Sequence, residues 1–132
     1  MSLAINLIDE TTSGDVVAKT TLKLVSERIT LRELIAQRIR EEVDSHNRKR
    51  QQEVFSGLVQ PTDTEQVLNG YRLRKPRLIS FDDQLNLAIE AFQSNGYFVL
   101  HDDQQVSDLD EPLTLRDNSQ VSFIKLVPLV GG

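Results

Sequence analysis

The last residues of the sequence, Pro128-Leu129-Val130-Gly131-Gly132, hold the group best suited to chemistry, a carboxylate on an unhindered glycine. Glycine has no Cβ and reaches backbone angles that other residues avoid, so Gly131 and Gly132 can lie extended in a narrow enzyme channel. Pro128 restricts φ and lacks an N–H group, so strand pairing is expected to stop there. The alternative is that the two glycines are only a frayed chain end.

A second set of candidate residues is basic and comes from two stretches of the chain. Its members are Arg48, Lys49, Arg50, Arg72, Arg74, Lys75 and Arg77. If the segment between the stretches folds back, these side chains form one patch that could dock an acidic enzyme surface or a nucleic acid. The alternative is a set of separately solvated charges. Few aromatic residues lie between the charges, which disfavours a stacking site for nucleic acid.

Other kinds of chemistry find little support in the sequence. There are no cysteines, which excludes thiol nucleophiles and thiolate metal sites. The two histidines, His46 and His101, are far apart, and His101-Asp102-Asp103 is typical of a turn. No phosphate-binding glycine loop, Ser-His-Asp pattern or metal-spaced set is present. We therefore expect no catalytic residue, no metal, no bound cofactor and no enzymatic activity of the chain's own.

Composition predicts a cytoplasmic protein of one domain. The 132 residues carry a formal charge of −5 with both signs mixed, which does not indicate wholesale binding to nucleic acid or membrane. No segment approaches the roughly 20 apolar residues that span a bilayer. The absence of cysteine fits a reducing compartment.

The first third of the chain predicts a hairpin followed by a helix. Residues 3–8 and 16–25 are strand-like and flank a turn at 11–15. Thr30 and Glu33 have capping-box spacing, so a helix begins at Leu31. Its apolar stripe is Leu31, Leu34, Ile35, Ile39 and Val43, which we expect to pack on the sheet. The end of this helix stays open between about residue 46 and about residue 55.

The middle of the chain, about 48–80, is interpreted as a helical insertion. Thr62 and Glu65 repeat the capping-box spacing, and Asn69-Gly70 would stop a helix of one or two turns. A further helix is expected at about 81–95, with Ser80 as its N-cap and Asp82 and Asp83 in its first turn.

Strands are expected at 97–100, 104–106, 109–115 and 121–127. We expect the last strand to run parallel to residues 3–8 at the centre of the sheet, because both are apolar on both faces. On it, Val121 and Phe123 face one side, whereas Ile124 and Leu126 face the other. Ile124 and Leu126 are either an exposed partner patch or are buried under the insertion. The fold class is α+β, a mixed sheet with a packed helix.

This element order, together with the Gly-Gly ending, resembles the β-grasp fold of ubiquitin-like proteins over residues 3–47 and 96–132. In that family the last strand lies beside the first, and the tail leaves the body as a free arm. The ending Pro128-Leu129-Val130-Gly131-Gly132 also resembles that of the bacterial sulfur carriers of molybdopterin and thiamin synthesis. Those proteins are much smaller and lack residues like 48–80. The longer form is similar to bacterial ubiquitin-like proteins found beside conjugation enzymes.

The resemblance implies a protein modifier whose Gly132 carboxylate is adenylated by an ATP-using activating enzyme and passed to a target amine. Gly131 would allow passage through the enzyme channel, and Pro128, Leu129 and Val130 would be recognised there. An activating-enzyme homologue is the expected partner, together with a conjugating enzyme and a deconjugating metallopeptidase. Two alternatives stay open: a sulfur carrier with a C-terminal thiocarboxylate, and an interaction module that is never activated. The sequence does not name the target.

Overall fold

The structure is a computed structural model that describes residues 2–49, 53–68 and 70–126. The chain divides into two compact units. The first comprises Met1–Arg32 and Phe92–Gly132, and the second comprises Glu33–Ala91. The second unit is wider than the insertion expected at about 48–80, because most of both helices belongs to it. Mixed sheet and helices together make the fold α+β, as the sequence predicts.

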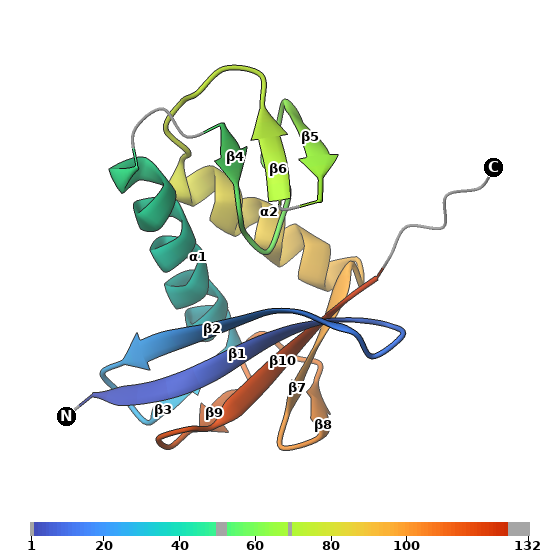
Figure 1. The fold of residues 1–132 in the computed structure, drawn as a ribbon. Coiled ribbons are helices and arrows are strands. Elements are labelled where there is room, and N and C mark those ends of the chain that lie inside the picture. Colours follow the sequence, from blue (N-terminus) through green and yellow to red (C-terminus); the bar gives the residue numbers. More distant parts are fainter. Residues whose placement is uncertain (1, 50–52, 69, 127–132) are drawn as a thin grey trace. The chain divides into compact units, whose positions relative to one another are not determined.

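The first unit contains a five-stranded mixed sheet in the order β2-β1-β10-β7-β8 (Figure 1). Its strands are β1 (Leu3–Thr11), β2 (Val16–Leu24), β7 (Tyr97–His101), β8 (Gln104–Val106) and β10 (Gln120–Lys125). β1 and β10 pair in parallel, and all the other neighbours are antiparallel. The predicted hairpin and the central, parallel position of the last strand are both confirmed.

One face of this sheet supplies the apolar core of the first unit. Ile5 and Leu7 on β1 lie on this face, and Asn6 between them is only half-buried. Leu7 is in register with Val121, and Phe123 on β10 is in register with Val99 on β7. All five apolar side chains are at most 2% exposed. These buried side chains favour the observed register, because a slip of one residue would turn them to the opposite face.

A small two-stranded sheet leads the chain into the first helix. β3 (Arg28–Thr30) pairs antiparallel with β9 (Pro112–Thr114), where proline stands at the first position of the strand. The backbone N–H groups of Leu31 and Arg32 donate to the carbonyls of Glu111 and Leu109 at 3.1 and 2.8 Å. These bonds satisfy donors in the first helical turn that have no partner within the helix.

The helix α1 (Leu31–Arg48) begins where the capping signal predicts. Leu34, Ile35 and Ile39 are fully buried, and Val43 is 2% exposed, so the burial predicted for the stripe is confirmed. The helix ends near the shorter of the two limits left open by the sequence. The second helix, α2 (Phe81–Gln93), is confirmed as well. The Ser80 hydroxyl accepts the N–H of Asp83 at 3.2 Å, as an N-cap does.

The predicted helical insertion is wrong. The second unit instead contains a three-stranded antiparallel sheet in the order β4-β6-β5. Its strands are β4 (Val54–Phe55), β5 (Thr64–Val67) and β6 (Gly70–Leu73). Asp63 has a φ of 59°, which a first-turn helical residue cannot adopt, and the Thr64 hydroxyl donates to the Pro61 carbonyl at 2.7 Å. Val67 and Gly70 are in register, so a hairpin joins β5 to β6 where the sequence predicts the end of a helix.

Gly70→Ala is expected to destabilise the second unit. Gly70 has a φ of 146°, and an added Cβ would overlap the Phe55 carbonyl oxygen across the β4-β6 pair. The backbone conformation alone should cost about 1–3 kcal/mol, and the overlap should add to that cost. Urea unfolding followed by circular dichroism measures the loss. Gly14→Ala is the control, because Gly14 also has a positive φ, 90°, but has nothing within 4 Å of its added Cβ. Equal losses for the two variants would contradict the overlap.

Candidate functional site

The strand β10 is the root of the Gly-Gly tail and is held on both sides. It pairs with β1 from Gln120 to Lys125 and with β7 from Val121 to Lys125. The rings of Phe123, which is fully buried, and Tyr97, which is 3% exposed, have centroids 6.0 Å apart. Beyond β10, the N–H of Leu126 donates to the Gly96 carbonyl at 3.4 Å. The chain therefore reaches Leu126 from a central strand that is paired on both sides.

The predicted tail residues lie outside the described part of the chain. These are Pro128, Leu129, Val130, Gly131 and Gly132. The predicted end of strand pairing at Pro128 also falls there, as does Val127. The structure therefore places the start of the tail, and the roles assigned to the tail residues stay predictions.

The predicted partner patch lies on the face of β10 opposite Phe123. Ile124 is half-buried and Leu126 is 42% exposed. The alternative of full burial on both faces therefore does not describe Leu126. Ser122, between the buried Val121 and Phe123, is half-buried as well, so the alternation predicted for this strand is present.

Sequence reasoning missed two apolar residues on the same face. Phe98 on β7 is in register with Ile124, and Leu100 is in register with Ser122; both are half-buried. The signal was present in the alternation of β7, where Tyr97 and Val99 are buried and their neighbours are not. Because β7 pairs with β10, Phe98 and Leu100 lie on the same face as the predicted patch residues. We define the apolar patch as Phe98, Leu100, Ile124 and Leu126.

An ion pair lies across the two central strands. Lys125 Nζ is 4.0 Å from Asp9 Oδ2, and Asp9 is only 6% exposed. The Asp9 position faces the same side of the sheet as Phe123, its register partner on β10. Because partly buried charges are costly when unpaired, this contact favours the observed register at the end of β10. It also ties the last residue of the strand to the sheet.

Two side chains near the end of α1 bind the backbone at the end of the second basic stretch. His46 Nε2 lies 3.1 Å from the Arg77 carbonyl and donates to it, since a carbonyl only accepts. The Asn47 amide makes two bonds to the backbone of Ile79, at 3.0 and 2.9 Å. Arg48 and Lys49 follow directly in sequence. The second basic stretch is therefore held beside the end of α1 at Arg77.

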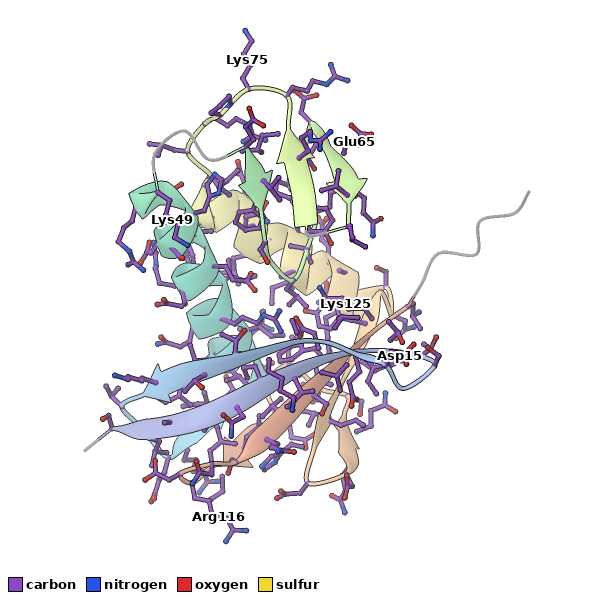
Figure 2. The ribbon with its side chains drawn as sticks, viewed as in Figure 1. Asp15, Lys49, Glu65, Lys75, Arg116 and Lys125 are labelled. Atoms are coloured by element: carbon purple, nitrogen blue, oxygen red, sulfur yellow. The ribbon has the colours of Figure 1, made fainter. Side chains whose placement is uncertain are left out.

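Several of these cations already have partners. Arg74 Nε is 3.1 Å from Asp63 Oδ1, and Arg48 Nη2 is 3.7 Å from Glu41 Oε1. Arg77 Nη2 donates to the Thr62 carbonyl at 2.6 Å. Arg72 is in register with Glu65 across the β5-β6 pair. In Figure 2, Lys75 projects from the loop after β6, and Lys49 lies at the end of α1. Arg50 lies outside the described residues.

The two histidines serve different structural purposes. His46 is 6% exposed, and its ring meets Phe55 edge-on with centroids 5.4 Å apart. His101 Nε2 is 3.4 Å from Asp102 Oδ2, at the turn between β7 and β8.

Among residues 2–49, 53–68 and 70–126, no three His, Asp or Glu side chains gather as metal ligands would. In the same residues, neither helix is long and apolar enough to cross a membrane.

Comparisons with known proteins do not extend this description. No protein-family model, no curated protein and no solved structure matches the chain.

Proposed function

We propose that the chain is a ubiquitin-like protein modifier with a β-grasp fold, activated at the Gly132 carboxylate. The supporting observation is the parallel β1-β10 pair at the centre of the sheet β2-β1-β10-β7-β8. In a β-grasp protein the last strand lies beside the first, and the tail follows it. The buried strand β10 leads directly toward Pro128 and the two glycines.

The chemistry begins with a poor electrophile, because a carboxylate resists attack by an amine. In the activating enzyme, a Gly132 carboxylate oxygen attacks the α-phosphorus of ATP, and pyrophosphate leaves. The resulting acyl-adenylate is then attacked at its carbonyl carbon by a partner thiol or a target amine, and AMP leaves with the bonding electron pair. Transfer to an amine ends in an amide bond, and the amine loses its proton. ATP and the catalytic groups belong to the partner enzyme.

The chain's own contribution is to present the tail and to be recognised. Gly131 has no side chain to obstruct a channel, and Leu129 and Val130 offer apolar contacts there. Pairing of β10 on both sides holds the start of the tail in place. The apolar patch of Phe98, Leu100, Ile124 and Leu126 gives an activating or conjugating enzyme a surface to contact beside this root.

The second unit favours the modifier over a sulfur carrier. Delivering sulfur to a small molecule needs little more than the tail, whereas this chain adds the sheet β4-β6-β5 and the helix α2. Such added surface suits recognition by several protein partners.

Intact mass spectrometry of the protein isolated from its native host tests the proposal. We expect a free carboxylate at Gly132 in one fraction and covalent adducts of larger mass, joined through Gly132 to lysine, in another. Replacement of one oxygen by sulfur at the terminal carboxylate would instead identify a sulfur carrier. If only the mass of the unmodified chain is found, even after enrichment for conjugates, the proposal is contradicted. The chain would then be an interaction module that is never activated.

A further inference from the structure

The second unit carries a basic surface assembled from two stretches of sequence. We define the basic surface as Arg48, Lys49, Arg72, Arg74, Lys75 and Arg77, all of which are exposed. The bonds from His46 to the Arg77 backbone and from Asn47 to the Ile79 backbone hold the end of the second stretch beside the end of α1, where Arg48 lies. Because these bonds come from one end of α1, the surface is a product of folding rather than a run of sequence.

The charge of the chain is strongly divided. Residues 48–77 contain seven Lys and Arg against three Asp and Glu, a formal charge of +4, although the whole chain carries −5. The remaining residues therefore carry −9. The ion pairs of Arg74 with Asp63 and of Arg48 with Glu41 are exposed to solvent, and such pairs exchange readily with other partners. A net positive surface on an acidic protein is suited to binding an acidic segment.

The first unit carries such a segment. Residues 102–111 contain five acidic residues and no Lys or Arg. We define the acidic segment as Asp102, Asp103, Asp108, Asp110 and Glu111, and each of these side chains is exposed. The segment includes the turn between β7 and β8 and the loop that leads to β9. Arg32 Nε contacts Asp110 Oδ1 at 3.2 Å, which shows that a cation can be accepted there.

We propose that the basic surface of one copy binds the acidic segment of a second copy. Both surfaces are exposed, and their charges are opposite and similar in size. The contact joins two different surfaces, so it is head-to-tail, and each added copy leaves one basic surface and one acidic segment available. Reversible, salt-sensitive association into short chains of copies is the consequence. The inference does not depend on the tail or on its activation.

Nucleic acid is the other polyanion that a basic surface could bind, but the observations favour protein. Tyr71 lies on the opposite face of β6 from Arg72, and Phe55, its register partner, is buried. These rings are therefore not placed to stack on bases alongside the cations. The sequence pI of about 5.0 also differs from the basic pI typical of nucleic-acid-binding domains.

The test uses the full-length chain and sedimentation velocity over a range of protein concentrations. Salt is set at about 25 mM and about 300 mM, where the Debye length is roughly 20 Å and roughly 6 Å. We expect the sedimentation coefficient of the wild type to rise with concentration at low salt and to stay constant at high salt. A wild type that stays monomeric at low salt would overturn the proposal.

Two charge variants separate the surfaces. The basic variant Lys49→Glu/Lys75→Glu takes the charge of residues 48–77 from +4 to 0. The acidic variant Asp102→Asn/Asp103→Asn/Glu111→Lys takes residues 102–111 from −5 to −1. Asparagine tolerates the positive φ of 52° and 61° at Asp102 and Asp103. Circular dichroism is used to check that both variants fold. Neither variant should self-associate.

Mixing the two variants is the decisive step. The basic variant retains an acidic segment and the acidic variant retains a basic surface, so an equimolar mixture should form pairs of one copy each and no longer chains. The control Lys19→Glu/Lys23→Glu has the same charge change on β2 and should associate as the wild type does. Association of the basic variant alone, or a mixture that stays monomeric, would overturn the proposal. So would binding of a single-stranded oligonucleotide at a lower concentration than self-association.

Discussion

Removal of Gly132 is expected to abolish adenylation while leaving the free energy of unfolding unchanged. The deletion moves the carboxylate one residue back, so it no longer reaches the α-phosphate in the activating enzyme. The described core of the first unit ends on β10, where Val121 and Phe123 are fully buried, so the deletion removes no buried side chain. ATP–pyrophosphate exchange with an activating enzyme from the same organism measures adenylation. Urea unfolding measures stability.

Gly131→Val is expected to have the same effect by a different route. A β-branched side chain restricts the backbone and adds bulk where the proposed channel admits only a bare chain. Gly14→Ala is the control, since it alters a glycine in the β1-β2 turn and should leave exchange at the wild-type rate. If the truncated chain exchanges as fast as the wild type, the chemistry does not take place at Gly132. If the wild type shows no ATP–pyrophosphate exchange, the chain is not activated, and the alternative of an interaction module is favoured.

Phe123→Ala is expected to cost about 3–5 kcal/mol of unfolding free energy, the range for deleting a buried aromatic ring. Phe123 is fully buried on the central strand β10, and its loss would leave a cavity beside Tyr97, whose ring centroid is 6.0 Å away. A second ring, Phe92, lies 5.9 Å from Tyr97, so the cluster limits collapse of the cavity. Chemical denaturation followed by circular dichroism gives the free energy and the dependence on denaturant.

Ile124→Ala is the matched control for this substitution. Ile124 is the next residue on β10, faces the opposite side and is only half-buried, so its loss should cost clearly less than the loss of Phe123. It belongs to the apolar patch, so we expect it to weaken contact with a partner enzyme more than it weakens the fold. Equal destabilisation by the two variants would show that both faces of β10 are equally packed, contrary to the observed burial.

The regular parts of the fold could be predicted from local patterns. The spacing of Leu34, Ile35 and Ile39 defines a helical face, and all three are fully buried. Two strand-like runs on either side of the turn at 11–15 indicate the hairpin β1-β2, and the apolar last strand indicates its central place. The predicted patch residues Ile124 and Leu126 also lie on the face assigned to them. These features depend on side chains within one turn or one strand, so the sequence contains enough information to place them.

The insertion shows where local patterns are ambiguous. The Thr62 and Glu65 spacing suits a helix, yet Glu65 lies within the strand β5 and Thr62 precedes it. The choice depends on pairing with β6. Leu73 of β6 pairs with Thr64, which is distant in the sequence, and Gly70 pairs with Val67 across the hairpin. Four residues of either structure differ little in local free energy, so hydrogen bonds to a neighbouring strand determine the result. No spacing rule within the segment contains that information.

Local patterns in the sequence specify the order of the main strands and helices, the buried face of α1, the alternation of side chains on β10, and the Gly-Gly tail with the chemistry it suggests. The folded structure adds the register in which β1 and β10 pair, the place of Phe98 and Leu100 beside Ile124, and the bonds by which His46 and Asn47 hold Arg77 and Ile79 beside α1. The two kinds of information differ in the sequence distance between the residues that interact. Periodicity and capping depend on neighbours along the chain, whereas strand pairing and side-chain to backbone bonds join residues more than thirty or a hundred positions apart, and their free energy appears only when the chain has folded.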